Sequence, residues 1–163
     1  MSDAAQVTIR AAGTGDGATI FHLIHELAIY EKLAHAVIAT PQLIEATLSD
    51  PAATAHAIIA EQNGVVVGMA FYFYNFSTFL GRNGLYIEDL YVRPETRGAG
   101  VGQHLLKHLA AKAIAKGCGR MEWSVLDWNE PAIAFYKRLG AQHLHEWHIY
   151  RLEGDALHTL AAA

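Results

Sequence analysis

The chain has little of what stabilises extracellular domains or crosses membranes. Cys118 is the only cysteine among 163 residues, so no internal disulfide can form. No apolar run reaches the roughly 18 residues of a membrane span, and the polar start MSDAAQVT lacks the basic and apolar segments of a leader peptide. These absences predict a protein of the reducing cytoplasm that does not bind a membrane.

Positive charge is also scarce. The 12 Lys and Arg residues against 16 Asp and Glu give a net charge of -4, and no basic run resembles those that follow a nucleic-acid backbone. The sequence contains no repeat, linker or low-complexity tract. A chain of this length buries roughly 70% of the surface that its unfolded form exposes. We therefore expect a single domain over residues 1–163 and no nucleic-acid partner.

What the sequence does contain is a hydrophobic period that changes several times. Apolar residues at helical spacing begin at Ile20 and recur at Leu23 and Leu27, which predicts an amphipathic first helix. The remaining patterns give the order β, α, α, three strands, α, β, α, β, a mixed sheet with helices on its faces. The predicted strands are residues 6–10, 55–62, 65–74, 84–92, 119–126 and 141–152, and the later helices are 40–50, 103–116 and 129–139.

Turn and cap residues support this division. Asn63-Gly64 lies between two β-prone runs, which is the strongest short-range signal for a hairpin. Thr40 before Pro41, and Asn129 two residues before Pro131, are typical of helix starts.

The first of two glycine clusters, RAAGTGDGATIF, matches a dinucleotide-binding pattern. Gly13, Gly15 and Ala18 fit GxGxx[GA] after a strand. The dinucleotide-binding fold also needs a second parallel strand within about 30 residues, and the sequence predicts no strand between the first one and residue 55. Asp16 would place a carboxylate beside the pyrophosphate. We therefore interpret Thr14 and Asp16 as capping residues of the first helix and disfavour a nucleotide site here.

The second cluster, RPETRGAGVGQHLL, fits neither the dinucleotide pattern nor a P-loop. A predicted strand ends at Val92, and Gly98, Gly100 and Gly102 lead into a helix whose first amides have no internal acceptor. Those amides, the helix dipole and Arg97 could bind an anion, and the missing Cβ atoms would let phosphate oxygens approach. A flexible turn that needs positive φ is the alternative.

At this cluster the chain resembles a known family. RGAGVG is similar to the pyrophosphate loop, Arg/Gln-x-x-Gly-x-Gly/Ala, of the GCN5-related N-acetyltransferases (GNAT). HELAIYEKL, LYIEDLYVRPETRGAGVG and WNEPAIAFYKRLGA resemble segments of its spermidine/spermine and thialysine branch, in the same order. The resemblance implies an α/β (α+β) GNAT fold, with a twisted mixed sheet of six to seven strands flanked by about four helices. It also implies acetyl-CoA as co-substrate and a homodimer.

The resemblance assigns roles to individual residues. Tyr136 would be the general acid that protonates the departing CoA thiolate. Without the family, a Tyr packed in the core would be the favoured interpretation, and capping alone would explain Asn129. The positions that the resemblance gives to cofactor binding are Leu90, Val92, Arg97, Gly98, Ala99, Gly100, Val101, Gly102, Asn129 and Tyr136.

Acidic residues lie where apolar ones are expected. Alternation in LYIEDLYV puts Asp89 on the face of Ile87 and Glu88 on the opposite face, and Glu31 continues the apolar stripe of the first helix. An unpaired buried carboxylate is costly, so these acids should border a wet cleft or bind a cation. Structural acids that pair with Arg or cap amides are the alternative. By resemblance the amine site contains Tyr30, Glu31, Glu88, Asp89 and Trp147, with Glu88 as a base that acts through a water.

The sequence thus predicts an acetyl-CoA-dependent N-acetyltransferase that acts on a small cationic amine. Ser77 and Phe79 align where the polyamine branch carries an acid and a Trp, which puts spermidine itself in doubt. A non-catalytic acyl-CoA sensor and an enzyme for peptide or protein amines are the alternatives. His104 and His108, one turn apart on a polar helix face, are not expected to bind a metal, and no metal is predicted.

Overall fold

The structure is a computed structural model that describes residues 6–163. Residues 1–5, most of the polar start from which the lack of a leader peptide was inferred, lie outside the described residues. The chain divides into two compact units, one that ends at Ser124 and one that spans Val125–Ala163. The first unit contains the sheet and three α-helices, and the second contains two α-helices.

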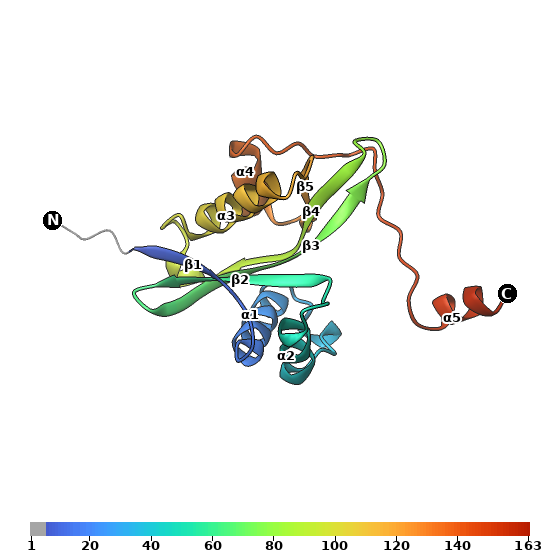
Figure 1. Ribbon diagram of the computed structural model, residues 1–163, viewed down its shortest axis with the longest axis horizontal. Coiled ribbons are helices and arrows are strands. Elements are labelled where there is room, and N and C mark those ends of the chain that lie inside the picture. The colour runs from blue at the N-terminus through green and yellow to red at the C-terminus, as the bar shows by residue number, and fades with distance from the viewer. Residues whose placement is uncertain (1–5) are drawn as a thin grey trace. The chain divides into compact units, whose positions relative to one another are not determined.

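A five-stranded mixed sheet forms the centre of the first unit (Figure 1). The strands follow one another in chain order, β1 to β4 pair antiparallel, and β4 pairs parallel with β5. The predicted mixed sheet is therefore confirmed. The strands are β1 (Val7–Ala11), β2 (Ala55–Gln62), β3 (Val65–Ser77), β4 (Arg82–Val92) and β5 (Met121–Trp123).

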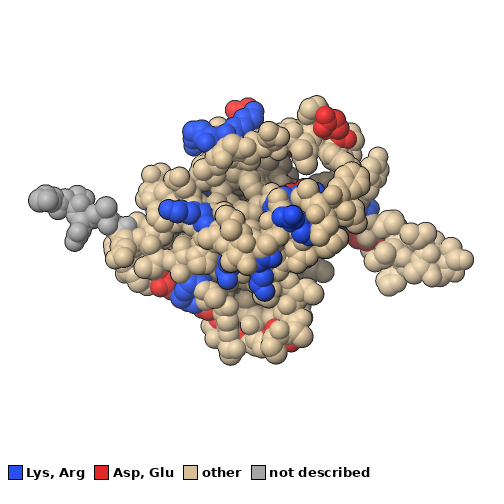
Figure 2. All heavy atoms as spheres, turned by 45° about the horizontal axis from the view of Figure 1, so that its top comes forward, with Lys and Arg blue, Asp and Glu red and all other residues tan. Residues whose placement is uncertain are grey.

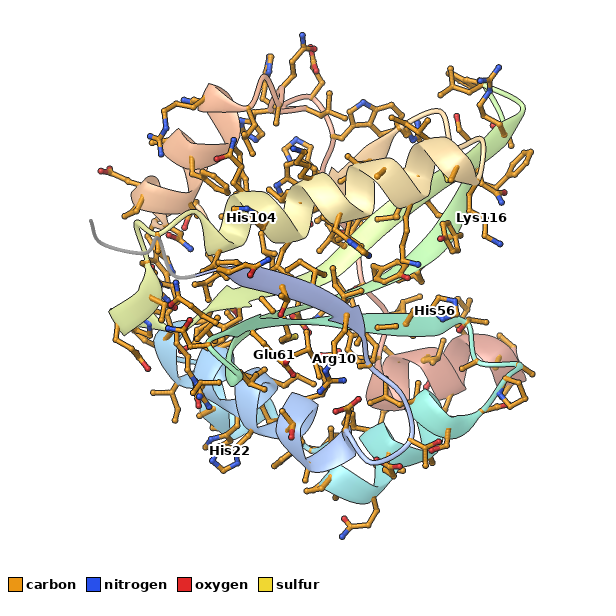
Figure 3. All side chains as sticks on the ribbon, turned by 60° about the vertical axis from the view of Figure 1, so that its left-hand side comes forward. Arg10, His22, His56, Glu61, His104 and Lys116 are labelled. Atoms are coloured by element: carbon orange, nitrogen blue, oxygen red, sulfur yellow. The ribbon has the colours of Figure 1, made fainter. Side chains whose placement is uncertain are left out.

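Helices cover both faces of this sheet. In Figure 3 α1 and α2 lie on one face and α3 on the other. The apolar stripe of α1 buries Ile20 and Leu23 fully against Ile59 and Met69 of the sheet, and α3 buries Leu105 fully. The helices are α1 (Gly17–Tyr30), α2 (Pro41–Ser49), α3 (Val101–Ala115), α4 (Glu130–Arg138) and α5 (Gly154–Ala162), with short 3-10 helices η1 (Ala34–Ala36) and η2 (Pro94–Thr96).

The sheet has fewer strands than the six to seven expected. Residues 141–152 were predicted as a strand but form none, and α5, which follows them, was not predicted. Alternation shows which side chains could share a face, but a strand forms only where a neighbour satisfies its backbone hydrogen bonds. Apolar side chains of this segment remain exposed, with Trp147 75% and Tyr150 93% accessible.

The hairpin prediction and the helix caps predicted at Thr40 and Asn129 are confirmed. Asn63 (φ 52°) and Gly64 (φ 76°) both adopt the positive φ of a tight hairpin between β2 and β3. The Thr40 hydroxyl accepts a hydrogen bond from the Leu43 amide at 3.3 Å. In the second unit Asn129 is the N-cap of α4. The turn and the two caps could be predicted from the sequence because they depend only on neighbouring residues.

A bulge in β4 changes which of its side chains share a face. Asp89 pairs with Phe71, while Ile87 pairs with the next residue of β3, Tyr72, so Glu88 is an extra residue in the ladder. Phe71 packs against the core cluster beneath α1. The strict alternation predicted from sequence is therefore wrong here: Asp89 lies on the α1 face and Ile87 on the opposite one.

The first glycine cluster does not present an open anion site. One carboxylate oxygen of Glu45 on α2 accepts a hydrogen bond from the Gly15 amide and the other from the Gly17 amide, both at 2.7 Å. These bonds lower the pKa of Glu45 below its usual value. A side chain 28 residues away thus occupies the start of α1, which local sequence could not reveal.

Asp16 does not cap α1 through its side chain, contrary to expectation. Its carboxylate instead accepts a hydrogen bond from the Gly13 amide at 2.9 Å and pairs with Arg10 at 2.9 Å. Arg10 also binds Glu61 on β2 at 2.8 Å, beneath the sheet in Figure 3. The Arg10 pair lowers the pKa of Asp16. Asp16 therefore ties the loop after β1 to the sheet.

Gly17→Ala is expected to destabilise the first unit. A Cβ at Gly17 would lie 2.6 Å from the Cα of Glu45, so α2 must move away from α1. Overpacking of this kind costs about 1–3 kcal/mol, which corresponds to a loss of roughly 2–12 °C in Tm for a domain of this size. Thermal denaturation of the variant and of the wild type measures this loss of Tm. Gly13→Ala is the control, because its Cβ meets nothing within 4 Å; an equal loss in both variants would contradict the close contact.

The surface gives two further observations. No helix among residues 6–163 is long and apolar enough to cross a membrane. On the face shown in Figure 2, the Lys and Arg side chains lie in separate small groups. Nucleic-acid-binding surfaces more often carry a continuous basic patch, so this face has no obvious track for a phosphate backbone.

Candidate active site

The predicted pyrophosphate loop connects the end of β4, through η2, to the start of α3. Gly98 (φ 85°) and Gly100 (φ 81°) adopt backbone conformations that side chains disfavour, and Gly100 is the N-cap of α3. A Cβ at Gly98 would meet nothing within 4 Å. The open space at Gly98 and the first amides of α3, which have no acceptor within their own helix, suit a phosphate group, because both favour a close anionic ligand.

His104, on the first turn of α3, supports this loop. Its Nδ1 lies 2.9 Å from the Gly100 carbonyl oxygen, which can only accept, so Nδ1 carries the hydrogen. Figure 3 shows His104 at the loop end of the helix. Sequence reasoning considered His104 only as a metal ligand. Among residues 6–163 no group of three His, Cys, Asp or Glu side chains gathers as metal ligands would.

One side of β4 is partly open beside this loop. The parallel ladder with β5 covers only Leu85 to Ile87. Within the described chain, β4 therefore has no β5 partner from Glu88 to Val92, the part that contains the predicted cofactor residues Leu90 and Val92. An extended molecule with amide groups could pair with this edge, as peptides do with open strands.

At the bulge Asp89 is close enough to two other carboxylates, Glu31 and Glu88, to be affected by their charges. Asp89 is half-buried, and Glu88 at the bulge is exposed. Burial, and then the negative charges of Glu88 and Glu31, raise the pKa of Asp89 to about 6. Burial also raises the pKa of Glu31, the residue that follows α1. Because carboxylates held together repel one another, this cluster favours a cation, and strongly shifted pKa values are typical of functional sites.

Arg97 lies at the junction between the loop and the acidic cluster. Its guanidinium carbon lies 4.6 Å from the centre of the Tyr30 ring, at the end of α1, and its Nε donates to the Val92 carbonyl at 2.9 Å. The structure thus brings Tyr30, Glu31, Glu88 and Asp89 and residues 97–102 together in the first unit. Sequence reasoning missed the stacking of Tyr30 on Arg97, since it joins residues far apart in the chain.

The other predicted site residues belong to the second unit. Asn129 accepts a hydrogen bond from the Ala132 amide at 3.4 Å, which makes it the N-cap of α4. Tyr136 lies two turns further along this helix, with its ring 5.6 Å from that of Phe135. Trp147 is exposed in the segment between α4 and α5. Capping accounts for Asn129 whether or not it also contacts a cofactor.

Comparison with known proteins identifies the class. A model of the Acetyltransferase (GNAT) family matches residues 20–141. The chain therefore belongs to the GNAT family of acetyltransferases, and the predicted fold and N-acetyltransferase activity are confirmed.

Particular relatives narrow the comparison. The chain is 42% identical to the thialysine N-epsilon-acetyltransferase of Bos taurus, over 95% of this chain and 97% of the relative. It is 33% identical to the L-ornithine N5-acetyltransferase NATA1 of Arabidopsis thaliana, over 93% of this chain and 86% of the relative. Among solved structures, an integron cassette protein from the mobile metagenome of V. cholerae aligns with a TM-score of 0.80, at 30% identity over 96% and 98% of the two chains.

Proposed function

We propose that the protein transfers an acetyl group from acetyl-CoA to the primary amine of a small cationic acceptor, such as a diamine, a polyamine or a lysine analogue. The observation that carries this proposal is the acidic cluster of Glu31, Glu88 and Asp89, which lies in the same unit as the glycine loop. The names of two relatives, for thialysine and for the N5 of L-ornithine, favour an amino acid with a side-chain amine.

The glycine loop would hold the cofactor. The first amides of α3 would donate to the pyrophosphate, and the bare Cα atoms of Gly98, Gly100 and Gly102 allow this approach. Ala99 and Val101 would contribute backbone atoms of the same loop. The open edge of β4 at Leu90 and Val92 would pair with the amide groups of pantetheine. Arg97, Asn129 and Tyr136 complete the proposed cofactor contacts.

The acids would bind the acceptor and prepare its nitrogen. Glu31 and Asp89 would hold the ammonium group, together with Tyr30 and Trp147. Glu88, at the exposed bulge, would accept one proton from the amine through a water. The neutral nitrogen then attacks the thioester carbonyl, so that a C–N bond forms while the C–S bond breaks. Tyr136 would donate its proton to the departing thiolate, and the second proton that the nitrogen loses as the amide forms would restore the Tyr136 hydroxyl through solvent. Both substrates are bound together throughout.

The raised pKa of Asp89 predicts a pH-dependent effect on stability. The folded protein binds this proton more tightly than the unfolded chain, whose pKa is near 3.8. The stabilising contribution of Asp89 is therefore complete below about pH 4 and lost as the pH rises to about 6. Asp89→Asn should raise Tm by a few degrees relative to wild type at pH 7.5, and by much less at pH 4.5.

Thermal denaturation of both proteins across this pH range is the measurement. Asp127→Asn, at an exposed acid of the second unit, is the control and should show no such dependence. A Tm difference that is constant with pH would contradict the electrostatic origin of the Asp89 effect. The same substitution should also raise the KM of the amine, because a cation-binding carboxylate is lost.

The experiment that tests the function is a measurement of CoA release with a panel of acceptors. Thialysine, lysine, ornithine, diaminopropane, putrescine and spermidine cover the relevant lengths and charges, and a peptide with a free N-terminus tests the alternative acceptor class. Turnover of at least one small amine supports the proposal. Binding of acetyl-CoA without turnover of any acceptor would favour the sensor, and turnover of the peptide alone would favour a protein acetyltransferase.

We further propose that the 163 residues act as one domain and that the protein is a cytoplasmic homodimer. Exposed large apolar side chains in the second unit, including Trp147, Ile149 and Tyr150, support self-association, because monomers rarely expose large apolar areas. Light scattering of the purified protein measures the mass. A monomer at micromolar concentration would contradict the dimer.

A further inference from the structure

The residue that precedes the glycine loop is held against α1. Arg97 lies with its guanidinium carbon 4.6 Å from the centre of the Tyr30 ring and 5.8 Å from that of Tyr91. Both distances are within the range of cation–π attraction. The hydrogen bond from Nε to the Val92 carbonyl, at 2.9 Å, fixes the side chain from a third direction. Arg97 is thus already bound to the protein, although it is exposed.

A second contact joins α1 to the segment between β4 and the glycine loop, one turn of α1 before Tyr30. Arg93, at the end of β4, donates to the two carboxylate oxygens of Glu26 at 3.1 and 2.9 Å. Glu26 and Tyr30 are four residues apart and lie on one side of α1. Arg93 and Arg97 are also four residues apart, on either side of η2. Helix α1 therefore fixes both ends of the segment that leads into the loop.

Gly98 and Gly100, in the loop beyond Arg97, have open space where a side chain would lie. No atom lies within 4 Å of a Cβ placed on Gly98, and only the His104 ring, at 3.6 Å, approaches one on Gly100. Glycines also have the greatest backbone freedom in the unfolded and mobile states. The orientation of the loop amides consequently depends on where Arg97 is held, and a loop that must be ordered on binding loses affinity.

We propose that Tyr30 is a positioning residue for the pyrophosphate loop, which it orients through Arg97. This inference rests on the proposed function of the loop, and it gives Tyr30 a role in addition to the amine contact proposed above. Because Glu31 follows Tyr30 directly, the helix end that carries an amine-site acid also supports the cofactor loop. Removal of the Tyr30 ring should therefore weaken cofactor binding, although the ring itself does not contact the cofactor in this proposal.

Tyr30→Leu should weaken coenzyme A binding by about three- to tenfold, the range expected for loss of a cation–π contact. Tyr30→Phe keeps the ring and should stay within about twofold of wild type. Calorimetric titration with coenzyme A, which cannot react, is the measurement. Ile29→Ala, at an exposed position of the same helix, is the control and should bind as wild type does.

The double variant distinguishes this role from a general loss of structure. In an Arg97→Gln background, Tyr30→Leu should cause no further loss of affinity, because the partner of the ring is already absent. The inference would be overturned if Tyr30→Leu reduced affinity as much in the Arg97→Gln background as in the wild type. It would also be overturned if Tyr30→Leu alone left the affinity unchanged. If only the KM of the amine rises, Tyr30 is an amine contact and the inference is wrong.

Hydrogen exchange of the free protein tests the same claim without any ligand. The amides of Ala99 and His104 donate to the carbonyls of Thr96 and Gly100, at 3.4 and 3.0 Å, and report on the order of the loop. Both should exchange severalfold faster in Tyr30→Leu than in Tyr30→Phe. Equal rates would refute the positioning role. A wild type that binds no coenzyme A would refute the proposed function instead, and the exchange rates would still decide the role of Tyr30.

Discussion

Tyr136→Phe is expected to lower kcat by about 100- to 10,000-fold while leaving both KM values nearly unchanged. The proposed general acid acts only as the C–S bond breaks, so its hydroxyl stabilises the transition state and not the bound substrates. A positioned acid typically contributes a factor of this size. Steady-state kinetics with the best acceptor of the panel, in which each substrate is varied while the other is saturating, give kcat and both KM values.

A stability measurement on the same variant separates catalysis from packing. Tyr136 lies on α4, whose N-cap is Asn129. A large rate loss with unchanged Tm supports general acid catalysis. A loss below about tenfold, or one that accompanies a marked fall in Tm, would indicate a structural hydroxyl. Tyr150→Phe, at a side chain that is 93% exposed, is the control and should retain full activity.

Gly100→Val is expected to weaken acetyl-CoA binding by at least tenfold. A Cβ at Gly100 would lie 3.6 Å from the His104 ring, and the larger Val side chain would crowd the N-cap of α3, where the loop amides would meet the pyrophosphate. A charge-assisted hydrogen bond contributes about 1.5–3 kcal/mol, so loss of one such bond corresponds to roughly 10- to 150-fold in affinity. Calorimetric titration with coenzyme A gives the dissociation constant directly.

Strain must be separated from the loss of the binding site. Gly100 has φ 81°, and a β-branched residue there also destabilises the fold. Gly64→Val is the matched control, because Gly64 has φ 76° and open space around it, in the β2–β3 turn. Both variants should lose thermal stability, but only Gly100→Val should lose affinity. Comparable affinity in the two variants would argue against a phosphate-binding loop at Gly100.

Parts of the candidate site have a short local signature. RGAGVG predicted glycines at the start of a helix, and Gly98 and Gly100 adopt positive φ there, which fits both an anion-binding loop and the alternative, a flexible turn. The acids in LYIEDLYV were recognised because charges are unusual in a central strand. Their faces were assigned wrongly, since the bulge at Glu88 depends on the register with β3 and not on the β4 sequence alone.

Contacts between distant segments were not predictable in the same way. Glu45 binds the amides of Gly15 and Gly17, and Tyr30 stacks on Arg97, yet neither pair has any local signature. Glu45 and Tyr30 each have an ordinary interpretation in their own segment, as a polar residue on a helix. Only the packing of α1 against its neighbours selects the partner, because it fixes which groups come within bonding distance.

The sequence by itself determined the elements whose causes are local. Hydrophobic period, the Asn63-Gly64 turn and the Thr40 and Asn129 caps depend on backbone preferences and on neighbours a few residues away. Tertiary structure alone decided that residues 141–152 form no strand and that Glu88 bulges out of β4. It also decided that burial, and then the charges of two other carboxylates, raise the pKa of Asp89 to about 6. Strand pairing and electrostatic coupling are both interactions between chain segments, so they exist only after the segments have been brought together.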